Sequence, residues 1–316
     1  MDTYPEVVAW LLDESQPSVR YRTLTGLLSR TSDDPEVQAT RAAIPTSAPV
    51  QHLMAMMHPD GYWLEKGRGA GIGYAGNGST HFVLAYLSEL AMDRTDPRVD
   101  RAVERYLSLT EPDCENPAFW QIPPDYSHHQ SCLYAYNLRT FIRLGYRDDD
   151  RIRERIRVLL ADERRDGGYL CDRPSFRPST KSCIRGSIKA LTAFAELPEL
   201  WGTPRCLQLV NYFLRRRLYY RMRAPDTIIR DELVRTIFPY TWRGSLIEPL
   251  WALSVMGYGQ HPALDDAWAR LATKADDRGR YVLDWPPSSG PFVPGKKSAP
   301  NKWVTLYAHL ALKHRG

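Results

Sequence analysis

The sequence lacks a long apolar segment. No stretch approaches the roughly 18 uninterrupted apolar residues that a membrane-spanning helix requires. The first residues, MDTYPEVVAW, have neither the basic region nor the apolar core of a secretion signal. These absences argue against a protein that spans or crosses a membrane, and we expect a cytoplasmic location.

Cysteine is scarce, with five residues in a chain of 316, at positions 114, 132, 171, 183 and 206. An odd number in a long chain without an export signal does not fit a disulfide framework. We therefore expect reduced thiols. Each of them could serve as a small buried hydrophobic residue or as a reactive group or metal ligand.

Several catalytic and phosphate-binding motifs are also missing: no G-x-S-x-G, no H-E-x-x-H and no glycine-rich phosphate loop occurs. The net charge of +5 would suit an anionic ligand, but it is small for a nucleic-acid binder. The run FLRRRLYYRMR at 213–223 mixes arginines with aromatic residues. It fits either a nucleic-acid contact or the solvated end of an outer helix, where cations are favourable.

A repeat runs through the chain. Asp60, Asp166 and Asp277 lie in related turns, HPDGYW, RRDGGY and ADDRGRY, separated by 106 and 111 residues. Further turns lie about halfway between them, so the repeating unit is about 53 residues. Each unit contains the turn, a loop, an apolar helix and an Arg/Glu-rich amphipathic helix. Because the first helix is apolar on nearly all sides and the second on one face, we expect concentric inner and outer layers.

The organisation follows from this repeat. No Gly/Ser-rich linker interrupts the sequence, so we expect a single all-α domain over 1–316. Residues 1–45 are interpreted as an N-terminal helical hairpin packed on about five repeats in 46–316. The acidic run Asp148, Asp149 and Asp150 resembles a metal-binding carboxylate cluster, but its position after LGYR favours the capping of a helix N-terminus.

The segments STHFVLAYLSEL, SCLYAYNLRTFIRLGY, DGGYLC, KSCIRGS and NKWVTLYAHLAL resemble a known superfamily. It contains the prenyltransferases and squalene cyclases, and the chain is most similar to small bacterial squalene-cyclase-like proteins of unassigned activity. The resemblance covers roughly residues 45–316. It implies an (α/α)6-type toroid and a terpene-cyclase-like or prenyltransferase-like enzyme that cyclises, isomerises or transfers a small hydrophobic, isoprenoid-like substrate.

The chain departs from this superfamily in its catalytic motifs. The Asp-x-Asp-Asp acid motif of the cyclases is absent, and STKSC occupies the corresponding helix start. The Asp-x-Cys pair of zinc-dependent prenyltransferases is absent as well. Any chemistry must therefore use other residues at this rim.

The starts of the inner helices predict the site, because in a toroid they meet at one rim and present unpaired N–H groups there. The candidate catalytic residues are His81, His129, Cys132, Tyr169, Cys183 and Trp242. Thiols and imidazoles suit zinc, and the candidate metal ligands are His81, Cys132, Cys171 and Cys183. The candidate substrate-binding and anion-binding residues are Trp120, Lys181, Arg185, Tyr240, Arg243 and Lys302.

Two other functions remain open at this point. The toroid could be a non-catalytic scaffold that binds a lipid or a peptide, with its aromatic residues serving as core packing. The segment SQPSVRYRTLTGLL at 15–28 is also typical of HEAT-like repeats, some of which bind nucleic acid. The oligomeric state is not predicted.

Overall fold

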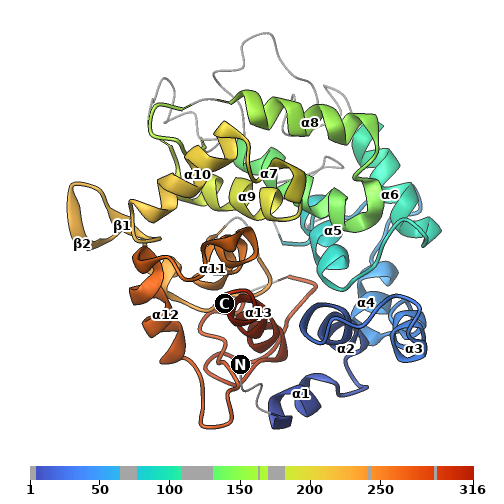
Figure 1. Cartoon of the computed structure of the whole chain (residues 1–316). Helices are drawn as coiled ribbons and strands as arrows, with labels where there is room; N and C mark the ends of the chain where they lie inside the picture. Colours follow the sequence, from blue (N-terminus) through green and yellow to red (C-terminus); the bar gives the residue numbers. More distant parts are fainter. Residues whose placement is uncertain are drawn as a thin grey trace.

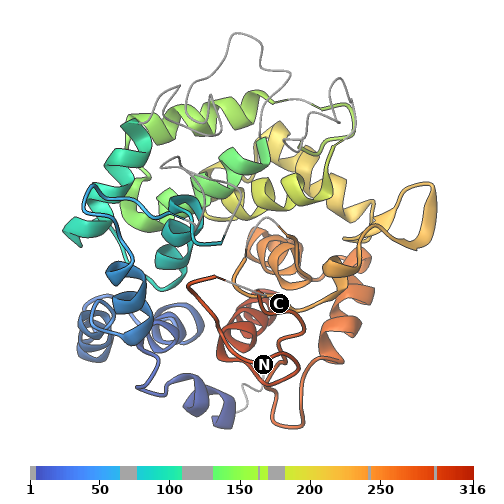
Figure 2. The same cartoon turned by 180° about the vertical axis from the view of Figure 1, so that it is seen from behind.

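The computed structural model describes residues 5–64, 77–108, 131–162, 164–169, 182–240, 243–287 and 290–316, and only the backbone of residues 131–134. The described chain is predominantly helical, which confirms the expected all-α class. Its helices form a ring of paired elements in which one helix of each pair lies nearer the centre (Figures 1 and 2). No helix in these ranges is long and apolar enough to span a membrane.

Two of the inner helices, α5 and α9, are buried on nearly all sides. Every residue of α5 is buried, and α9 buries all of its residues except Arg185. These are the segments whose sequence is apolar all round. The inner helices are α2 (Pro17–Arg22) with its π-helical continuation η1 (Thr23–Leu27), α5 (Thr80–Glu89), α7 (Ser131–Phe141), α9 (Ile184–Ala195), α11 (Ile247–Leu253) and α13 (Lys302–Lys313).

The outer helices bury a single stripe. In α6 the buried residues are 99, 102, 103, 106 and 107, which is the spacing of one helix face. The opposite face of α6 carries its arginines and acidic residues. The outer layer consists of α1 (Pro5–Leu11), α3 (Pro35–Ala43), α6 (Pro97–Ser108), α8 (Asp150–Ala161), α10 (Pro204–Leu214) and α12 (Asp265–Ala272), with α4 (Ala48–Ala55) between α3 and α5.

The N-terminal helices lie between the two ends of the repeat array. Successive contacts run from α5 through α7, α9 and α11 to α13, and α13 in turn packs against α2 and η1. On the other side, Arg22 donates from Nε to the carbonyl oxygen of Glu89 at 2.6 Å. Arg41 donates to the carbonyl oxygen of Ala91 at 2.5 Å. The N-terminal helices thus connect α13 to α5.

The repeated turns have a shared structural role. Gly61, Gly167 and Gly279 have φ of +85°, +80° and +72°, a region that favours glycine. The aromatic residue that follows each turn donates its backbone N–H to a hydroxyl of the next inner helix. These pairs are Trp63 with Thr80 (2.9 Å), Tyr169 with Ser187 (2.9 Å) and Tyr281 with Thr305 (2.8 Å). The turn therefore fixes the outer helix relative to the inner helix that follows.

Gly167→Ala should destabilise the protein by about 1–2 kcal/mol or more, because an alanine is strained at this φ. In addition, its Cβ would lie 2.8 Å from the carbonyl oxygen of Gln208. Gly202→Ala is the matched control, since a Cβ at Gly202 meets nothing within 4 Å. Urea unfolding of both variants measures the difference. Equal stabilities would contradict this role of the turn.

The acidic run at 148–150 is part of a helix start. The Asp149 carboxylate accepts the backbone N–H of Arg151 at 2.9 Å, as an N-cap does. Asp148 and Asp150 form exposed ion pairs with Arg153. The capping interpretation is confirmed.

The sequence analysis allowed residues 213–223 to form the solvated end of an outer helix, but α10 ends at Leu214. Arg217 and Leu218 adopt positive φ, which ends the helix. The chain then forms an antiparallel hairpin of β1 (Tyr220–Arg221) and β2 (Ala224–Ile228), which projects from the ring (Figures 1 and 2). The run of arginines therefore lies on a protruding hairpin and at its base.

Candidate active site

His81 lies in the first turn of α5 and is buried, with 1% of its surface exposed. Its ring packs against Phe82 and Tyr136, with centroids 4.7 and 4.9 Å away, and its Nδ1 lies 3.5 Å from the Tyr106 hydroxyl. Burial lowers the pKa of His81 to about 3, and a hydrogen bond with Asn137 only partly offsets this. The imidazole is therefore neutral at ordinary pH.

This burial predicts a pH-dependent stability. In the unfolded chain the histidine has a pKa near 6.5, so only the unfolded state gains a proton as the pH falls from about 6.5 toward 3. The stabilisation by neutral His81 is complete above this range and is lost below it. Between about pH 7.5 and about pH 5, the wild type should lose about 2 kcal/mol more than His81→Gln. Urea unfolding at the two pH values tests this, and parallel losses would contradict it.

Tyr169 and Cys183 lie side by side at the start of α9. The Cys183 N–H donates to the Tyr169 carbonyl oxygen at 2.8 Å. Tyr169 is fully buried, its hydroxyl donates to the Leu159 carbonyl at 2.6 Å, and the Arg205 guanidinium covers its ring at 3.9 Å. These contacts give Tyr169 a structural role in the turn. Cys183 is the N-cap residue of α9 and is half-buried.

The predicted anion-binding cations have partners in the structure. Lys302 lies 2.7 Å from the Asp13 carboxylate, and Arg185 donates to Glu232 from Nη2 at 2.7 Å. The Arg243 guanidinium lies over the Trp285 ring at 4.0 Å. An anion would have to compete with Asp13 for Lys302 and with Glu232 for Arg185. Anion binding stays a prediction.

The remaining predicted residues lie outside the described residues: Trp120, His129, Cys171, Lys181 and Trp242. Of Cys132 only the backbone is described, in the first turn of α7. Among the described residues, no group of three His, Cys, Asp or Glu side chains could hold a metal ion. Because two of the four proposed ligands fall outside that search, the zinc site stays a prediction.

A buried ion pair that the sequence analysis did not select lies between two inner helices. Lys189 of α9 donates from Nζ to Oε1 of Glu248, the second residue of α11, at 2.5 Å. Both side chains are 3% exposed. The other carboxyl oxygen of Glu248, Oε2, is buried and has no hydrogen-bond partner among the described residues. Burial raises the pKa of Glu248, and Lys189 only partly offsets it.

Tyrosines surround this pair. The Lys189 ammonium lies 5.4 Å from the centre of the Tyr136 ring. The Tyr136 hydroxyl donates to the backbone carbonyl of Tyr240. Burial raises the pKa of both phenols well above the usual value. The predicted residue Tyr240 thus belongs to a buried cluster that contains Tyr136, Lys189 and Glu248, and its phenol stays protonated.

A second charged cluster surrounds Glu89, the last residue of α5. Its Oε1 accepts from Arg139 at 2.6 Å and from Arg143 at 2.9 Å, and its Oε2 accepts from the Tyr307 hydroxyl. Burial would raise the pKa of Glu89, but Arg139, Arg143 and Arg22 together with Tyr307 hold it well below its usual range. Both oxygens are therefore occupied, and this carboxylate connects three inner helices.

Both clusters had a sequence signal. Inner helices that are otherwise apolar contain isolated charges: Glu89 in LAYLSEL, Arg139 in AYNLRTF, Lys189 in GSIKALTAF and Glu248 in SLIEPLWAL. A charge in such a helix must be paired or functional, because an unpaired buried charge is too costly. Glu89, Arg139 and Lys189 lie beyond the first turns of their helices, so a search confined to helix starts does not find them. Glu248 lies at a helix start, where the prediction favoured thiols, imidazoles and cations over carboxylates.

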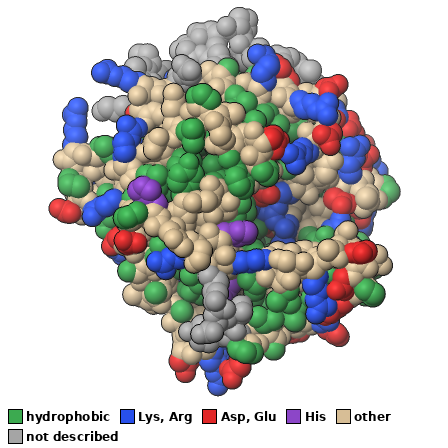
Figure 3. Space-filling model, viewed as in Figure 1, with side chains coloured by type: hydrophobic (Ala, Val, Ile, Leu, Met, Phe, Trp, Pro, Cys, Tyr) green, Lys and Arg blue, Asp and Glu red, His purple; other side chains and the backbone are tan. Residues whose placement is uncertain are grey.

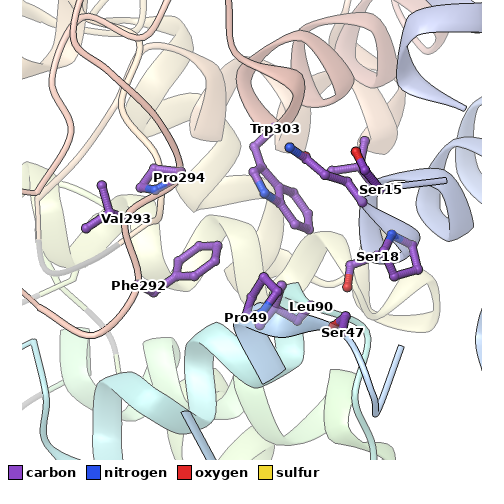
Figure 4. Close-up of a pocket in the computed structure, with 12 residues that line it drawn as sticks. Ser15, Ser18, Ser47, Pro49, Leu90, Phe292, Val293, Pro294 and Trp303 are labelled. Carbon is purple, nitrogen blue, oxygen red and sulfur yellow. The ribbon is translucent and has the colours of Figure 1, made fainter. Parts of the chain in front are cut away.

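A cavity of about 200 Å³ opens between α2, α4, α13 and the segment before α13 (Figure 4). Its apolar lining includes Phe292 and Trp303, and its polar lining consists of Ser15, Gln16, Ser18 and Ser47. Trp303 stacks on Phe238 with a centroid distance of 4.9 Å, and Phe238 lies 5.3 Å from Tyr240. A row of aromatic rings thus runs from this cavity to the cluster of Tyr136 and Glu248.

Comparison with known proteins relates this architecture to two solved structures. A glycosyl hydrolase of family 88 from Bacteroides vulgatus superposes with a TM-score of 0.54 at 13% identity, covering 99% of this chain and 97% of the other. A polysaccharide lyase superposes with a TM-score of 0.52 at 12% identity, with the same coverages. No family model and no curated protein matches the sequence. At these identities the likeness establishes the fold alone.

The expected relationship to squalene cyclases and prenyltransferases is wrong. The similar structures are a glycosyl hydrolase and a polysaccharide lyase, matched over nearly the whole length of both chains. The same finding overturns the terpene-cyclase or prenyltransferase activity that the resemblance implied. It also overturns the small hydrophobic, isoprenoid-like substrate. The physical reason lies in the repeated turn, whose glycine and aromatic residue hold helices together. They indicate an architecture and not a reaction.

Proposed function

We propose that the protein is a carbohydrate-active enzyme that cleaves a glycosidic linkage and uses Glu248 as its acid. The observation that carries this proposal is the Glu248 carboxyl, buried between inner helices, with a raised pKa and with an Oε2 atom that accepts no hydrogen bond from the described residues. A glycosidic oxygen must gain a proton as its bond breaks, and a carboxylic acid with a raised pKa is the group that supplies it.

The proposed fold is a closed (α/α)6 toroid. Of the described helices, α2 with η1 would be the sixth inner helix beside α5, α7, α9, α11 and α13. The inner helices α2, α5, α7, α9 and α11 are each followed by an outer helix that returns, and α13 follows the outer helix α12, so these inner helices all start at one end of the ring. Glu248 and Trp303 are both second residues of inner helices and hence belong to that end.

The two carboxyls inside the ring have opposite environments. The pKa of Glu248 is raised by burial, whereas the pKa of Glu89 is held low by its arginines. Because the two pKa values are shifted in opposite directions, we assign the transferable proton to Glu248. Glu89 stays ionised and is held by Arg139 and Tyr307, so we assign it no part in donating the proton.

Lys189 would act as a positioning residue. Its hydrogen bond to Oε1 fixes the orientation of the carboxyl and leaves Oε2 to face a ligand. The cavity beside Trp303 is lined by an aromatic ring face and by hydroxyl groups. A sugar ring has an apolar face that packs on aromatic rings and hydroxyl groups that form hydrogen bonds, so this lining matches it. We place the sugar in this cavity, from which the packed rings of Trp303, Phe238 and Tyr240 lead toward the Glu248 cluster.

The test is a cleavage assay on a panel of neutral and acidic polysaccharides and short oligosaccharides. Hydrolysis produces new reducing ends, and elimination produces an unsaturated sugar that is detected by its ultraviolet absorbance. We expect one of these products from at least one substrate. If the panel yields neither product and calorimetry detects no saccharide binding, the proposal fails.

A further inference from the structure

The hairpin formed by β1 and β2 is a rigid arm. At its base, the Tyr220 hydroxyl donates to the Asp266 carboxylate of α12 at 2.9 Å. Arg217 lies over the Tyr220 ring at 4.2 Å and donates to the carbonyl oxygen of Pro225 at 2.6 Å. These contacts hold the arm in the projecting position that Figures 1 and 2 show.

Positive charge gathers on the arm and in the segments at its base. Residues 215–231 contain six arginines and two aspartates, a net charge of +4 in a chain whose total is +5. Arg221, Arg223 and Arg230 are exposed, and none of them forms an ion pair with a carboxylate of the described residues. Figure 3 shows Lys and Arg side chains standing out along this edge of the molecule.

The turn at the tip of the arm carries one exposed apolar side chain, Met222. Arg221 pairs with Ala224, so Met222 and Arg223 form the turn, and Met222 is 52% exposed. The Met222 thioether lies between the guanidinium groups of Arg221 and Arg223. This arrangement suits the interface of a lipid bilayer, where apolar and charged groups lie side by side. Apolar groups enter the acyl region there while arginines remain at the level of the headgroups.

The same arm is a poor match for nucleic acid. Single-stranded nucleic acid is bound by exposed aromatic rings on which bases stack. Tyr219 is buried, and Tyr220 is half-buried under Arg217 with its hydroxyl bonded to Asp266. The arm therefore offers charge and the exposed Met222 but no exposed ring.

From the projecting geometry, the exposed arginines and the exposed Met222, we propose that this hairpin docks the protein on an anionic lipid surface. The contact is peripheral and electrostatic, with Met222 inserted at the interface. It is independent of the proposed catalytic function, because the arm lies on the outside of the ring and Glu248 lies inside it.

The test is flotation of the protein with phosphatidylcholine vesicles that contain or lack phosphatidylserine, at low and at raised salt. We expect binding to the anionic vesicles only, weakened by salt. The double variant Arg221→Glu with Arg223→Glu should bind roughly 30-fold more weakly or worse, since each arginine contributes about a fivefold factor. Met222→Ser should bind several-fold more weakly.

The matched control is Arg153→Glu with Arg157→Glu on α8, which changes the net charge equally at exposed positions. It should retain most of the binding. Equal losses in both double variants would show a general charge effect and overturn the proposal. So would absence of binding to anionic vesicles, or binding to single-stranded RNA in place of vesicles. Circular dichroism confirms the fold of each variant.

Discussion

Glu89→Gln should lower the free energy of unfolding by about 3–5 kcal/mol, the largest effect on stability that we expect from one substitution. The Glu89 carboxylate is the shared partner of Arg139, Arg143 and Tyr307, and Arg22 bonds its backbone carbonyl. Glutamine keeps the shape but removes the negative charge, which leaves the buried guanidinium groups of Arg139 and Arg143 with the more distant Glu196 carboxylate, at 3.4 and 3.8 Å, as their remaining partner. Urea unfolding at neutral pH measures the loss.

Two variants accompany this measurement. Glu154→Gln removes an exposed carboxylate paired with Arg157 on α8 and should change stability by less than about 0.5 kcal/mol. Tyr307→Phe removes one hydrogen bond to Glu89 and should cost about 1–3 kcal/mol, a loss that remains measurable if Glu89→Gln does not fold. Wild-type stability in both Glu89→Gln and Tyr307→Phe would contradict the proposed role of the cluster.

Glu248→Gln should lower the turnover of a cleaved glycan by about 10²- to 10⁴-fold, the range that general acid catalysis supplies. Glutamine can still accept the hydrogen bond from Lys189, but it has no acidic proton. Because the protonated carboxyl is the active form, wild-type turnover should fall as the pH rises through the raised pKa of Glu248. The variant should lose this limb of the pH profile.

The control for this prediction is Glu104→Gln, an exposed carboxylate on the outer helix α6 that pairs with Arg151 of the outer helix α8. It should keep full turnover. Lys189→Met tests the positioning role of Lys189. It should lower kcat and shift the pH at which turnover falls, while the affinity for the saccharide stays nearly unchanged. Unchanged turnover in Glu248→Gln would remove Glu248 from the mechanism.

Most of the fold could be predicted from the sequence, because its signals are local. The stripe of α6 and the all-round apolarity of α5 and α9 determine the two layers directly. The glycine-containing turns mark the repeats because Gly61, Gly167 and Gly279 must adopt positive φ. The hairpin after α10 was missed, since its strands are short and contain few β-branched residues.

The candidate site was far less predictable, because it depends on which helices lie together. Lys189 and Glu248 are 59 residues apart, and only the ring brings them within 2.5 Å. Tyr169 is predicted as an aromatic residue that could line the barrel, and its contacts with Leu159 and Arg205 show that it also packs in the turn, while its catalytic role stays a prediction. A family resemblance based on such turns predicted the architecture and gave the wrong chemistry.

Measuring the pKa of the Glu248 carboxyl tests the proposed role of this residue most directly. Carbon-13 NMR of glutamate-labelled protein, with the Glu248 signal assigned by its absence in Glu248→Gln, follows the carboxyl through a pH titration. We predict a pKa raised above the ordinary glutamate range, as burial beside Lys189 requires of an acid. An ordinary or lowered value would make the pair a structural ion pair and contradict the proposed role of Glu248.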